Sequence, residues 1–272
     1  DAFFAAPDIN KKQVTFKAEG NKYATLSDAE SFLKTCIGAK YTVKDIQVKP
    51  AKKSPSAPFT TSTLQQEASR KLGYGVARTM ILAQKLYEAG YISYMRTDSV
   101  SLSETAMEGI TGQINTSYGK KYVQVRKYKK KNESAQEAHE AIRPTYMDRL
   151  QVDIADGQKL YELIWKRTMA SQMSDAELEK TTAKIDISTN GEQLTAQGEV
   201  MKFDGFLKVY MESKDDDDMS EDEEDESMLP PLQPGQVLDL REMKATERFS
   251  RPAPRYTEAS LVKKLEELGI GR

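Results

Sequence analysis

The sequence predicts a multidomain protein of the α and β class, in which a helical region is inserted into a β-rich one. Residues 14–18 and 41–48 partly alternate apolar and polar side chains, which is the pattern of half-buried strands. From Thr60 to Lys180 the chain instead shows helix-start patterns, apolar stripes at helical spacing and glycine stops. From Thr181 the period of two returns, so a second β-rich part is expected.

The first β-rich part is predicted to contain one helix and to end at a hinge. Residues 27–38 are expected to be helical, because Ser27 and Glu30 form a capping-box pattern and Gly38 follows the last turn. Residues 50–58 are rich in Pro, Lys and Ser, which predicts a hinge and a domain boundary.

The central region is predicted to carry five helices. In chain order they are expected at 63–73, 76–89, 101–117, 134–143 and 156–173. Pro144 must end the fourth helix, because proline disfavours helical backbone at the residue before it. Residues 91–96, which follow the second helix, are rich in β-forming side chains and are expected to be extended.

The second β-rich part is predicted to hold several short strands. They are expected at 183–187, 194–196, 203–209 and 236–243. Residues 212–228 form an acidic insert, interpreted as a disordered surface loop, with mimicry of DNA as the alternative. A new helix is expected from Arg255 to Leu268. These patterns divide the chain into the segments 1–58, 59–180, 181–252 and 253–272.

Composition excludes several classes of protein. Cys36 is the only cysteine, so no disulfide framework can form, and a reducing compartment such as the cytoplasm is expected. No apolar run approaches the length of a membrane-spanning helix, and the first residues lack the pattern of a signal peptide. The chain lacks a starting Met and stops just after a helix, so we expect it to be part of a longer protein.

The net charge of −2 conceals an excess of basic residues outside one acidic segment. Of the 42 acidic residues, 10 lie between Asp215 and Glu226, which leaves 32 acidic residues against 40 basic ones elsewhere. Such a surface is compatible with a polyanionic partner. Residues 120–131 hold seven basic residues around Tyr122 and Tyr128. They are interpreted either as a solvated loop or as a surface that binds single-stranded DNA by charge and stacking.

A tyrosine and an arginine lie two residues apart in the predicted extended segment. On such backbone Tyr94 and Arg96 face the same side, so a phenol and a guanidinium would share one surface. A phenol has an ordinary pKa of about 10, and a nearby cation favours the phenolate. The guanidinium could also stabilise phosphoryl oxygens while the phenol attacks a phosphodiester. The alternative is a tyrosine that only packs at a domain edge.

The chain contains a single histidine, His139. If residues 134–143 are helical, His139 and Arg143 share a face, because residues four apart lie together on a helix. That face could hold phosphate groups, or it could simply be solvated. A single histidine excludes metal sites built from several histidines, and with only one cysteine a zinc site is not expected.

Four segments resemble motifs of the type IA DNA topoisomerases, in particular the bacterial topoisomerase I enzymes. Gly90–Ser99 (GYISYMRTDS) resembles the segment with that family's active-site tyrosine, and Gln136–Pro144 (QEAHEAIRP) resembles its histidine segment. Pro58–Gln66 and Arg255–Val262 are similar to the stretches before and after them, in the same order.

The resemblance implies a domain arrangement. The segment 59–180 would be the helical domain that carries the catalytic tyrosine, inserted in a β-rich arch domain of a toroidal enzyme. The segments 1–58 and 181–252 would form the two parts of that arch, and 253–272 would begin a truncated gate domain. The hinge at 50–58 would let the arch lift the tyrosine domain for strand passage.

The resemblance also implies residue roles. Tyr94 would attack single-stranded DNA and become linked to its 5′ phosphate, and Arg96 would contact the scissile phosphate. DNA-binding roles would fall on four further residues: His139, Arg143, Arg255 and Asp98. Cleavage, strand passage and religation would relax negatively supercoiled DNA without ATP.

The family holds Mg²⁺ with an acidic triad in an N-terminal Toprim domain, and this sequence shows no Toprim pattern. We therefore expect no metal ligands here, and neither cleavage nor relaxation of DNA by this chain alone. DNA is the expected partner of a monomer that is cytoplasmic, associated with the nucleoid and not bound to membranes. The alternative is a non-catalytic DNA-binding or interaction module in which Tyr94 is structural.

Overall fold

The computed structural model describes the chain apart from residues 8–10, 129–138, 212–228, 250–251, 253 and 271–272. The chain divides into two compact units. The sheet unit comprises residues 1–52, 177–203 and 220–252. The helical unit comprises residues 53–176, 204–219 and 253–272. The predicted acidic insert, and the first half of the helix predicted at 134–143, lie outside the described residues.

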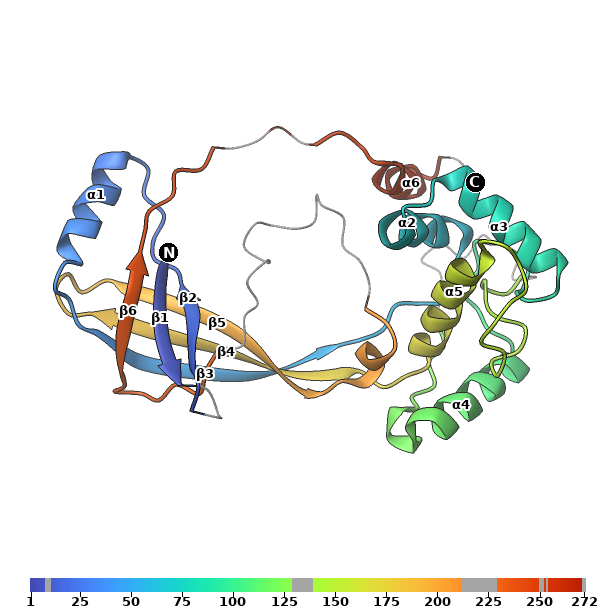
Figure 1. The fold of residues 1–272 in the computed structure, drawn as a ribbon, viewed down its shortest axis with the longest axis horizontal. Coiled ribbons are helices and arrows are strands. Elements are labelled where there is room, and N and C mark those ends of the chain that lie inside the picture. The colour runs from blue at the N-terminus through green and yellow to red at the C-terminus, as the bar shows by residue number, and fades with distance from the viewer. Residues whose placement is uncertain (8–10, 129–138, 212–228, 250–251, 253, 271–272) are drawn as a thin grey trace. The chain divides into compact units, whose positions relative to one another are not determined.

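Six strands of the described residues form one sheet in the sheet unit (Figure 1). They are β1 (Ala2–Pro7), β2 (Gln13–Ala18), β3 (Tyr41–Lys53), β4 (Ala176–Ile187), β5 (Gln193–Phe203) and β6 (Val237–Met243). Their order is β2-β1-β6-β3-β4-β5, and the pairs β1–β2, β1–β6, β3–β6 and β4–β5 are antiparallel. Strands from distant parts of the sequence therefore share one sheet.

The sheet buries an apolar core. The ring centroid of Phe4 lies 5.8 Å from that of its cross-strand neighbour Phe16 and 5.3 Å from that of Tyr41. Strands β1 and β4 alternate buried with less buried residues over much of their length, as expected where one face is covered. Helix α1 (Leu26–Thr35) packs Phe32 against this core, although none of its residues is completely buried.

Two strands differ from the prediction at the start of the chain. Strand β1 is not predicted, because its sequence AFFAAP is almost wholly apolar and shows no alternation. Strand β3 continues to Lys53, so the first part of the predicted hinge at 50–58 is strand instead. Local composition marks proline as a breaker, but Pro50 is accommodated within this strand.

The strand predicted at 203–209 is also wrong. Strand β5 ends at Phe203, and Gly205–Lys208 forms a 3-10 turn, η2. Gly205 has a φ of +49°, and a Cβ atom there would lie 2.3 Å from the carbonyl oxygen of Asp175. The turn therefore requires glycine, because only a residue without a side chain permits this close approach.

The helical unit contains five α-helices within its described residues. They are α2 (Thr61–Leu72), α3 (Val76–Glu88), α4 (Glu104–Tyr118), α5 (Gly157–Ser171) and α6 (Glu258–Glu267), and a 3-10 turn η1 spans Lys120–Tyr122. Helix α5 lies deep in the unit, with Leu160, Ile164 and Met169 fully buried. Helix α6 packs beside α2 (Figure 1). The Glu258 carboxylate accepts a hydrogen bond (2.8 Å) from the backbone N–H of Val76, which begins α3.

Four helix starts differ from the predicted ones by one to three residues. Helix α1 begins after Thr25 and α2 after Thr60, both earlier than predicted, while α4 begins after Ser103 and α6 after Thr257, both later than predicted. Each of these side chains accepts a hydrogen bond from a backbone N–H of the first turn. Several Ser and Thr residues compete near each start, and packing of the apolar face selects among them.

Candidate active site

The tyrosine segment, residues 91–98, leaves helix α3 through a turn at Gly90. The N–H of Tyr91 donates to the carbonyl of Leu86 (2.9 Å), and the N–H of Gly90 donates to the carbonyl of Tyr87 (2.8 Å). These two bonds form a Schellman motif, which needs a positive φ at the residue after the cap. Gly90 has a φ of +73°, which glycine adopts without steric cost. Local backbone bonds therefore fix the start of the segment to the last turn of α3.

The tyrosine segment is not the strand that the sequence predicts. Ile92 forms an isolated antiparallel bridge to Pro144, and the residues that follow belong to no strand. Burial nevertheless alternates along the segment, with Met95 buried and Tyr94 and Arg96 exposed. The phenol and the guanidinium are therefore both accessible to solvent, as the hypothesis of a shared surface requires.

The hydroxyl of Ser93 bonds the tyrosine segment to the segment that follows His139. Ser93 Oγ donates to the carbonyl of Ala141 (2.7 Å) and accepts from the N–H of Arg143 (2.9 Å). The N–H of Ser93 donates to the carbonyl of Arg143 (2.9 Å). One serine thus makes three bonds that hold two distant stretches of the sequence side by side.

The hydroxyl of Thr61, in the first turn of α2, holds the other end of the tyrosine segment. Thr61 Oγ1 donates to the carbonyl of Met95 (2.8 Å) and accepts from the N–H of Thr97 (2.9 Å). The N–H of Thr61 also donates to the carbonyl of Thr97 (2.8 Å). The backbone is therefore held by hydrogen bonds on both sides of Tyr94.

The ring of Tyr94 lies near two other rings. Tyr87 meets it edge to face, with the centroids 5.3 Å apart, and the imidazole of His139 lies 6.2 Å away, centroid to centroid. Edge-to-face pairs are favourable, so Tyr87 restrains the orientation of the phenol. Tyr94 keeps 41% of its surface exposed, so a ligand as large as a nucleic acid strand can reach it.

The helix predicted at 134–143 is wrong over its described part. None of the residues from His139 to Arg143 is helical, and Ile142 forms an isolated bridge to Phe59. Extended backbone lets Ile142 bury its side chain completely, which outweighs the local capping pattern. His139 is exposed and Arg143 is half-buried, but the two do not share a helical face.

The guanidinium of Arg143 is paired with Glu140. Arg143 Nη2 lies 2.6 Å and Nε 3.1 Å from Glu140 Oε2, while Nη1 donates to the carbonyl of Pro144 (3.0 Å). The other oxygen of Glu140 accepts from the N–H of Ser103 (2.6 Å) at the start of α4. Burial alone would raise the pKa of Glu140, but hydrogen bonds from Ser103 and Arg143 lower it below its ordinary value.

The two remaining candidates lie on exposed backbone. Asp98 is the exposed last residue of the tyrosine segment. Arg255 is exposed two residues before Thr257, whose side chain caps α6. The structure thus brings Tyr94 close to His139 and ties Arg143 to the same segment through backbone bonds.

The candidate site does not fit a metal ion by itself. Among the described residues, no group of three or more His, Cys, Asp or Glu side chains could hold one.

Residues 120–128, the described part of the predicted basic segment, do not offer a stacking surface. Tyr122 is buried, and its hydroxyl donates to Asp204 (2.8 Å). The hydroxyl of Tyr128 makes hydrogen bonds to the carbonyls of Ser171 (3.0 Å) and Pro55 (3.1 Å). The aromatic side chains of this segment serve packing, which favours the interpretation as a surface loop.

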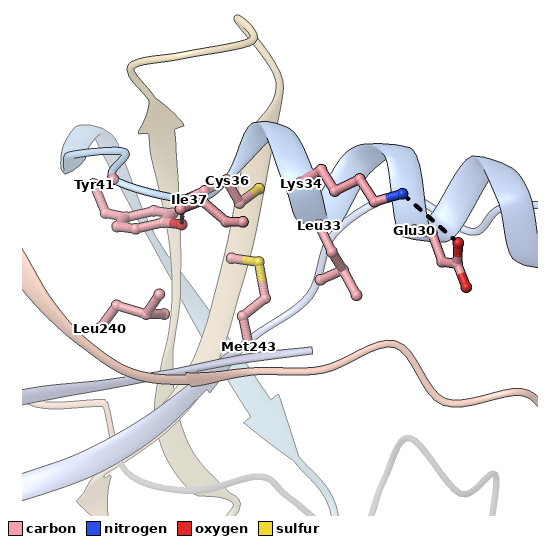
Figure 2. Close-up of a pocket in the computed structure, with 9 residues that line it drawn as sticks. Glu30, Leu33, Lys34, Cys36, Ile37, Tyr41, Leu240 and Met243 are labelled. Atoms are coloured by element: carbon pink, nitrogen blue, oxygen red, sulfur yellow. Dashed lines mark hydrogen bonds and ion pairs between the residues drawn. The ribbon is translucent and has the colours of Figure 1, made fainter.

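A pocket of about 480 Å³ lies in the sheet unit between α1 and β6 (Figure 2). Its walls are mainly apolar, with Leu33 and Ile37 facing Leu240 and Met243. Cys36 lines the pocket as well, and burial raises the pKa of its thiol, which disfavours the reactive thiolate. No sequence pattern predicts this pocket.

Four residues around Tyr94 are not singled out by the sequence: Thr61, Tyr87, Ser93 and Glu140. Most of their contacts join stretches that lie tens of residues apart or cross a turn, and only the spacing of three between Glu140 and Arg143 is local. The sequence contains one indication of the role of Tyr87. Gly90 predicts a tight turn, which brings the last turn of α3 near the segment that follows it.

Comparison with known proteins defines the class. A family model described as DNA topoisomerase matches residues 4–272, so this chain belongs to the DNA topoisomerase family, in its type IA class. The chain is similar to DNA topoisomerase 1 of Zymomonas mobilis, with 46% identity over 259 residues that cover 94% of this chain and 21% of that protein. DNA topoisomerase 1 of Rickettsia typhi is 49% identical over 249 residues, 86% of this chain and 31% of that protein.

A solved structure is similar over the whole chain. The structure of full-length topoisomerase I from Thermotoga maritima superposes with a TM-score of 0.73 at 32% identity. The match covers 100% of this chain and 44% of that one. The chain spans between about a fifth and a third of the length of the two DNA topoisomerase 1 relatives named above. Among the residues that the structure describes, no helix combines the length and apolar character that a bilayer span requires.

Proposed function

We propose that this chain supplies the nucleophile of an enzyme that relaxes negatively supercoiled DNA without ATP. The observation that carries the proposal is the setting of Tyr94. Its phenol is exposed, lies beside the imidazole of His139, and is carried by backbone that is hydrogen-bonded on both sides. Membership of the type IA class supports the same reading.

The proposed reaction is a transesterification. The phenol oxygen of Tyr94 forms a bond to the phosphorus of a phosphodiester in single-stranded DNA, and the bond from phosphorus to the 3′ oxygen breaks. The phenol gives up its proton, and the departing 3′ oxygen takes one up. The products are a 5′-phosphotyrosine and a 3′ hydroxyl, and religation is the reverse step. One phosphate ester is exchanged for another, so no nucleotide needs to be hydrolysed.

The neighbouring side chains have distinct proposed roles. Arg96 neutralises charge on the phosphoryl oxygens as the phenol attacks, for which a guanidinium is well shaped. His139, close to the phenol, contacts the strand next to the scissile phosphate. Arg143 is engaged by Glu140, so its contact with DNA requires the phosphate to share or replace that ion pair. Asp98 and Arg255 are proposed to contact the strand further away.

We assign the segments of the chain to the domains of a toroidal enzyme. Residues 59–180 form the domain that carries the tyrosine, 1–58 and 181–252 form the β-rich arch, and 253–272 begin a gate domain. Support comes from the sheet, in which strands from both proposed parts of the arch pair. In the complete protein, Mg²⁺ is proposed to bind ligands outside the described residues and to supply positive charge near the scissile phosphate.

The decisive experiment uses the full-length protein and a 5′-labelled or 3′-labelled single-stranded oligonucleotide. After denaturation, the proposed enzyme retains a covalent adduct on the 5′ phosphate, and Tyr94→Phe abolishes both the adduct and plasmid relaxation. An adduct that survives Tyr94→Phe would mean that this tyrosine is structural. If no adduct forms under any condition while DNA still binds, the non-catalytic binding module is the correct function.

The isolated 272-residue chain is expected to be inactive, because it offers no metal-binding group within its described residues. It should bind single-stranded DNA without cutting it, as a monomer. Relaxation of a supercoiled plasmid by the chain alone would contradict this. We propose a cytoplasmic, nucleoid-associated location for the complete protein, which fluorescence imaging of a tagged copy can test.

A further inference from the structure

A groove of about 370 Å³ lies between helix α4 and the segment 143–148 in the helical unit. Its volume falls near the lower end of the range of small-molecule sites, roughly 300–1,000 Å³. Helix α4 contributes Thr105, Gly109 and Gln113 to its lining. The opposite wall contains Thr145 and Tyr146. None of these residues has a role in the chemistry proposed above.

The lining combines apolar and hydrogen-bonding groups. The apolar residues of the lining include Ala106, Ile110 and Pro144, of which Ile110 and Pro144 are buried, and Gln113 and Thr145 are polar residues of the same lining. A flat heteroaromatic ring with polar edges matches such a lining, because it can bury its faces while its edges find donors and acceptors. A nucleobase has this shape and this distribution of polar atoms.

Tyr146 provides a stacking surface at the groove. Its side chain is 60% exposed although it is large and aromatic. The guanidinium of Arg149 lies 6.0 Å from the ring centroid of Tyr146 and 5.3 Å from that of Tyr91. A cation over the ring restrains the orientation of Tyr146, and the exposed part of the ring can stack on an aromatic group.

The charges in the groove favour a base over a phosphate. Asp148 is one of the lining residues, and its negative charge disfavours an anion there. Arg143 lines the groove as well, but its guanidinium is engaged by Glu140 and by the carbonyl of Pro144. A neutral ring with amino groups can donate hydrogen bonds to a carboxylate, whereas a phosphate cannot.

The groove is continuous with the tyrosine segment through backbone bonds. The N–H of Thr145 donates to the carbonyl of Tyr91 (2.9 Å), and Ile92 bridges Pro144. Paired extended segments lie about 5 Å apart, so the wall of the groove adjoins the backbone that carries Tyr94.

We infer that this groove binds a nucleobase of the single-stranded DNA on which Tyr94 acts. The inference rests on the proposed function, because it takes the same DNA strand as the ligand. It adds a subsite in which Tyr146 stacks on a base and α4 lies along the edge of that base. The residues around Tyr94 bind the phosphates of the strand.

Two glycines of helix α4 supply a matched pair of variants. A Cβ atom at either Gly109 or Gly112 would meet no atom within 4 Å, but only Gly109 lines the groove. Gly109→Leu therefore projects a side chain into the groove, and Gly112→Leu adds the same side chain elsewhere on the helix. Both substitutions favour helical backbone, so both proteins should fold at least as stably as the parent.

The test measures equilibrium binding by the full-length protein carrying Tyr94→Phe, so that cleavage does not interfere. The probes are a fluorescent single-stranded oligonucleotide and an abasic strand of equal length, at one salt concentration. Gly109→Leu should weaken binding of the base-bearing strand by roughly tenfold and leave the abasic strand unchanged. Gly112→Leu should change neither, and Tyr146→Ala should weaken base-dependent binding while Tyr146→Phe retains it.

Three results would overturn the inference. Equal affinities of the Gly109 and Gly112 variants would show that no base enters the groove. An equal loss for the abasic strand would show that the groove contacts the DNA backbone. A melting temperature lowered only by Gly109→Leu, with unchanged DNA binding, would show that another part of the protein fills the groove. If the parent protein binds no single-stranded DNA at all, the proposed function fails together with the inference. If the parent protein binds DNA but the Gly109 variant behaves as described above, only the inference about the groove fails.

Discussion

The sheet unit and the helical unit hold their backbones in different ways. In the sheet unit, β4 and β5 pair without a register shift from Leu178 to Asp186, so each position is supported by its neighbours in the ladder. The tyrosine segment of the helical unit belongs to no helix or strand and depends on the hydroxyls of Thr61 and Ser93. The backbone with the candidate chemistry is therefore positioned by individual side chains, while repeating structure supplies the scaffold.

The tyrosines of the two units show the same contrast. In the sheet unit, burial raises the pKa of Tyr41 to about 12, and its hydroxyl donates to the carbonyl of Cys36 (3.2 Å). In the helical unit, burial raises the pKa of Tyr161 to about 12, and its hydroxyl donates to the carbonyl of Arg149 (2.6 Å). Both hydroxyls are used in packing, whereas Tyr94 is exposed. Exposure thus distinguishes Tyr94 from these two structural tyrosines.

The largest expected effect concerns the core of the sheet unit. Phe16→Ala removes a ring that packs on Phe4, and should lower the free energy of unfolding by about 3–5 kcal/mol. Denaturant unfolding measures this change. Phe249→Ala, at a residue 77% exposed, is the control and should stay within about 0.5 kcal/mol of the parent. Similar losses for both variants would contradict the assignment of this core.

A smaller effect is expected at the hydroxyl that holds the tyrosine segment. Ser93→Ala leaves the carbonyl of Ala141 and the N–H of Arg143 without their partner, at a cost of about 1–3 kcal/mol. Adduct formation by the full-length protein should slow by a larger factor than stability alone explains, because Tyr94 loses its fixed position. Ser117→Ala, at an exposed position of α4, removes only a hydrogen bond from the Gln113 amide and is the control. Equal rates for the two variants would show that Ser93 does not position Tyr94.

Helix α6 supplies a cap for α3, which predicts a modest effect. Glu258→Ala removes the acceptor of the Val76 N–H and a negative charge at the start of a helix, and should cost about 1 kcal/mol. Glu258→Gln keeps an acceptor and should cost less. Thermal unfolding distinguishes them, with Glu267→Ala, exposed at the last turn of α6, as the control. Identical melting temperatures for all three variants would rule out the cap.

The smallest expected effect is a dependence on pH at Glu140. Its pKa is lowered in the folded protein, so its contribution to stability is complete above the ordinary value of 4.5. The contribution is lost as the pH falls through the lower, folded pKa. The difference in melting temperature between the parent and Glu140→Gln should therefore shrink between about pH 6 and about pH 3. A difference that is constant across this range would contradict the ion pair with Arg143.

Much of the regular structure can be predicted from the sequence. The predicted mixed α and β class is confirmed, and the predictions for α3 and α5 agree with the structure to within about two residues. These helices combine a clear apolar stripe with an unambiguous end, such as Gly90 after α3. Where several hydroxyl residues compete as caps, as at Thr60 and Thr63, the local pattern misplaces the start.

The candidate site is less predictable, for a physical reason. The sequence places a phenol and a guanidinium two residues apart, and the structure leaves both exposed. The sequence also predicts a helix around His139 that the structure does not contain. Ile142 is instead buried beside Phe59, and local patterns do not reveal a contact between residues so far apart in the chain. Partners that meet only through folding, such as Thr61 with Thr97 and Ser93 with Ala141, lie tens of residues apart and leave no local spacing to detect.

The two ends of the tyrosine segment are held by separate hydrogen bonds, and this affects how the segment can move. The amide of Ser93 is bonded to the carbonyl of Arg143, while the amide of Thr97 is bonded to the hydroxyl of Thr61. Each amide can exchange its proton with solvent without the other opening, since no ladder links them. The phenol can therefore shift by loosening one end of its backbone while the other end stays attached, and the supporting helices need not unfold.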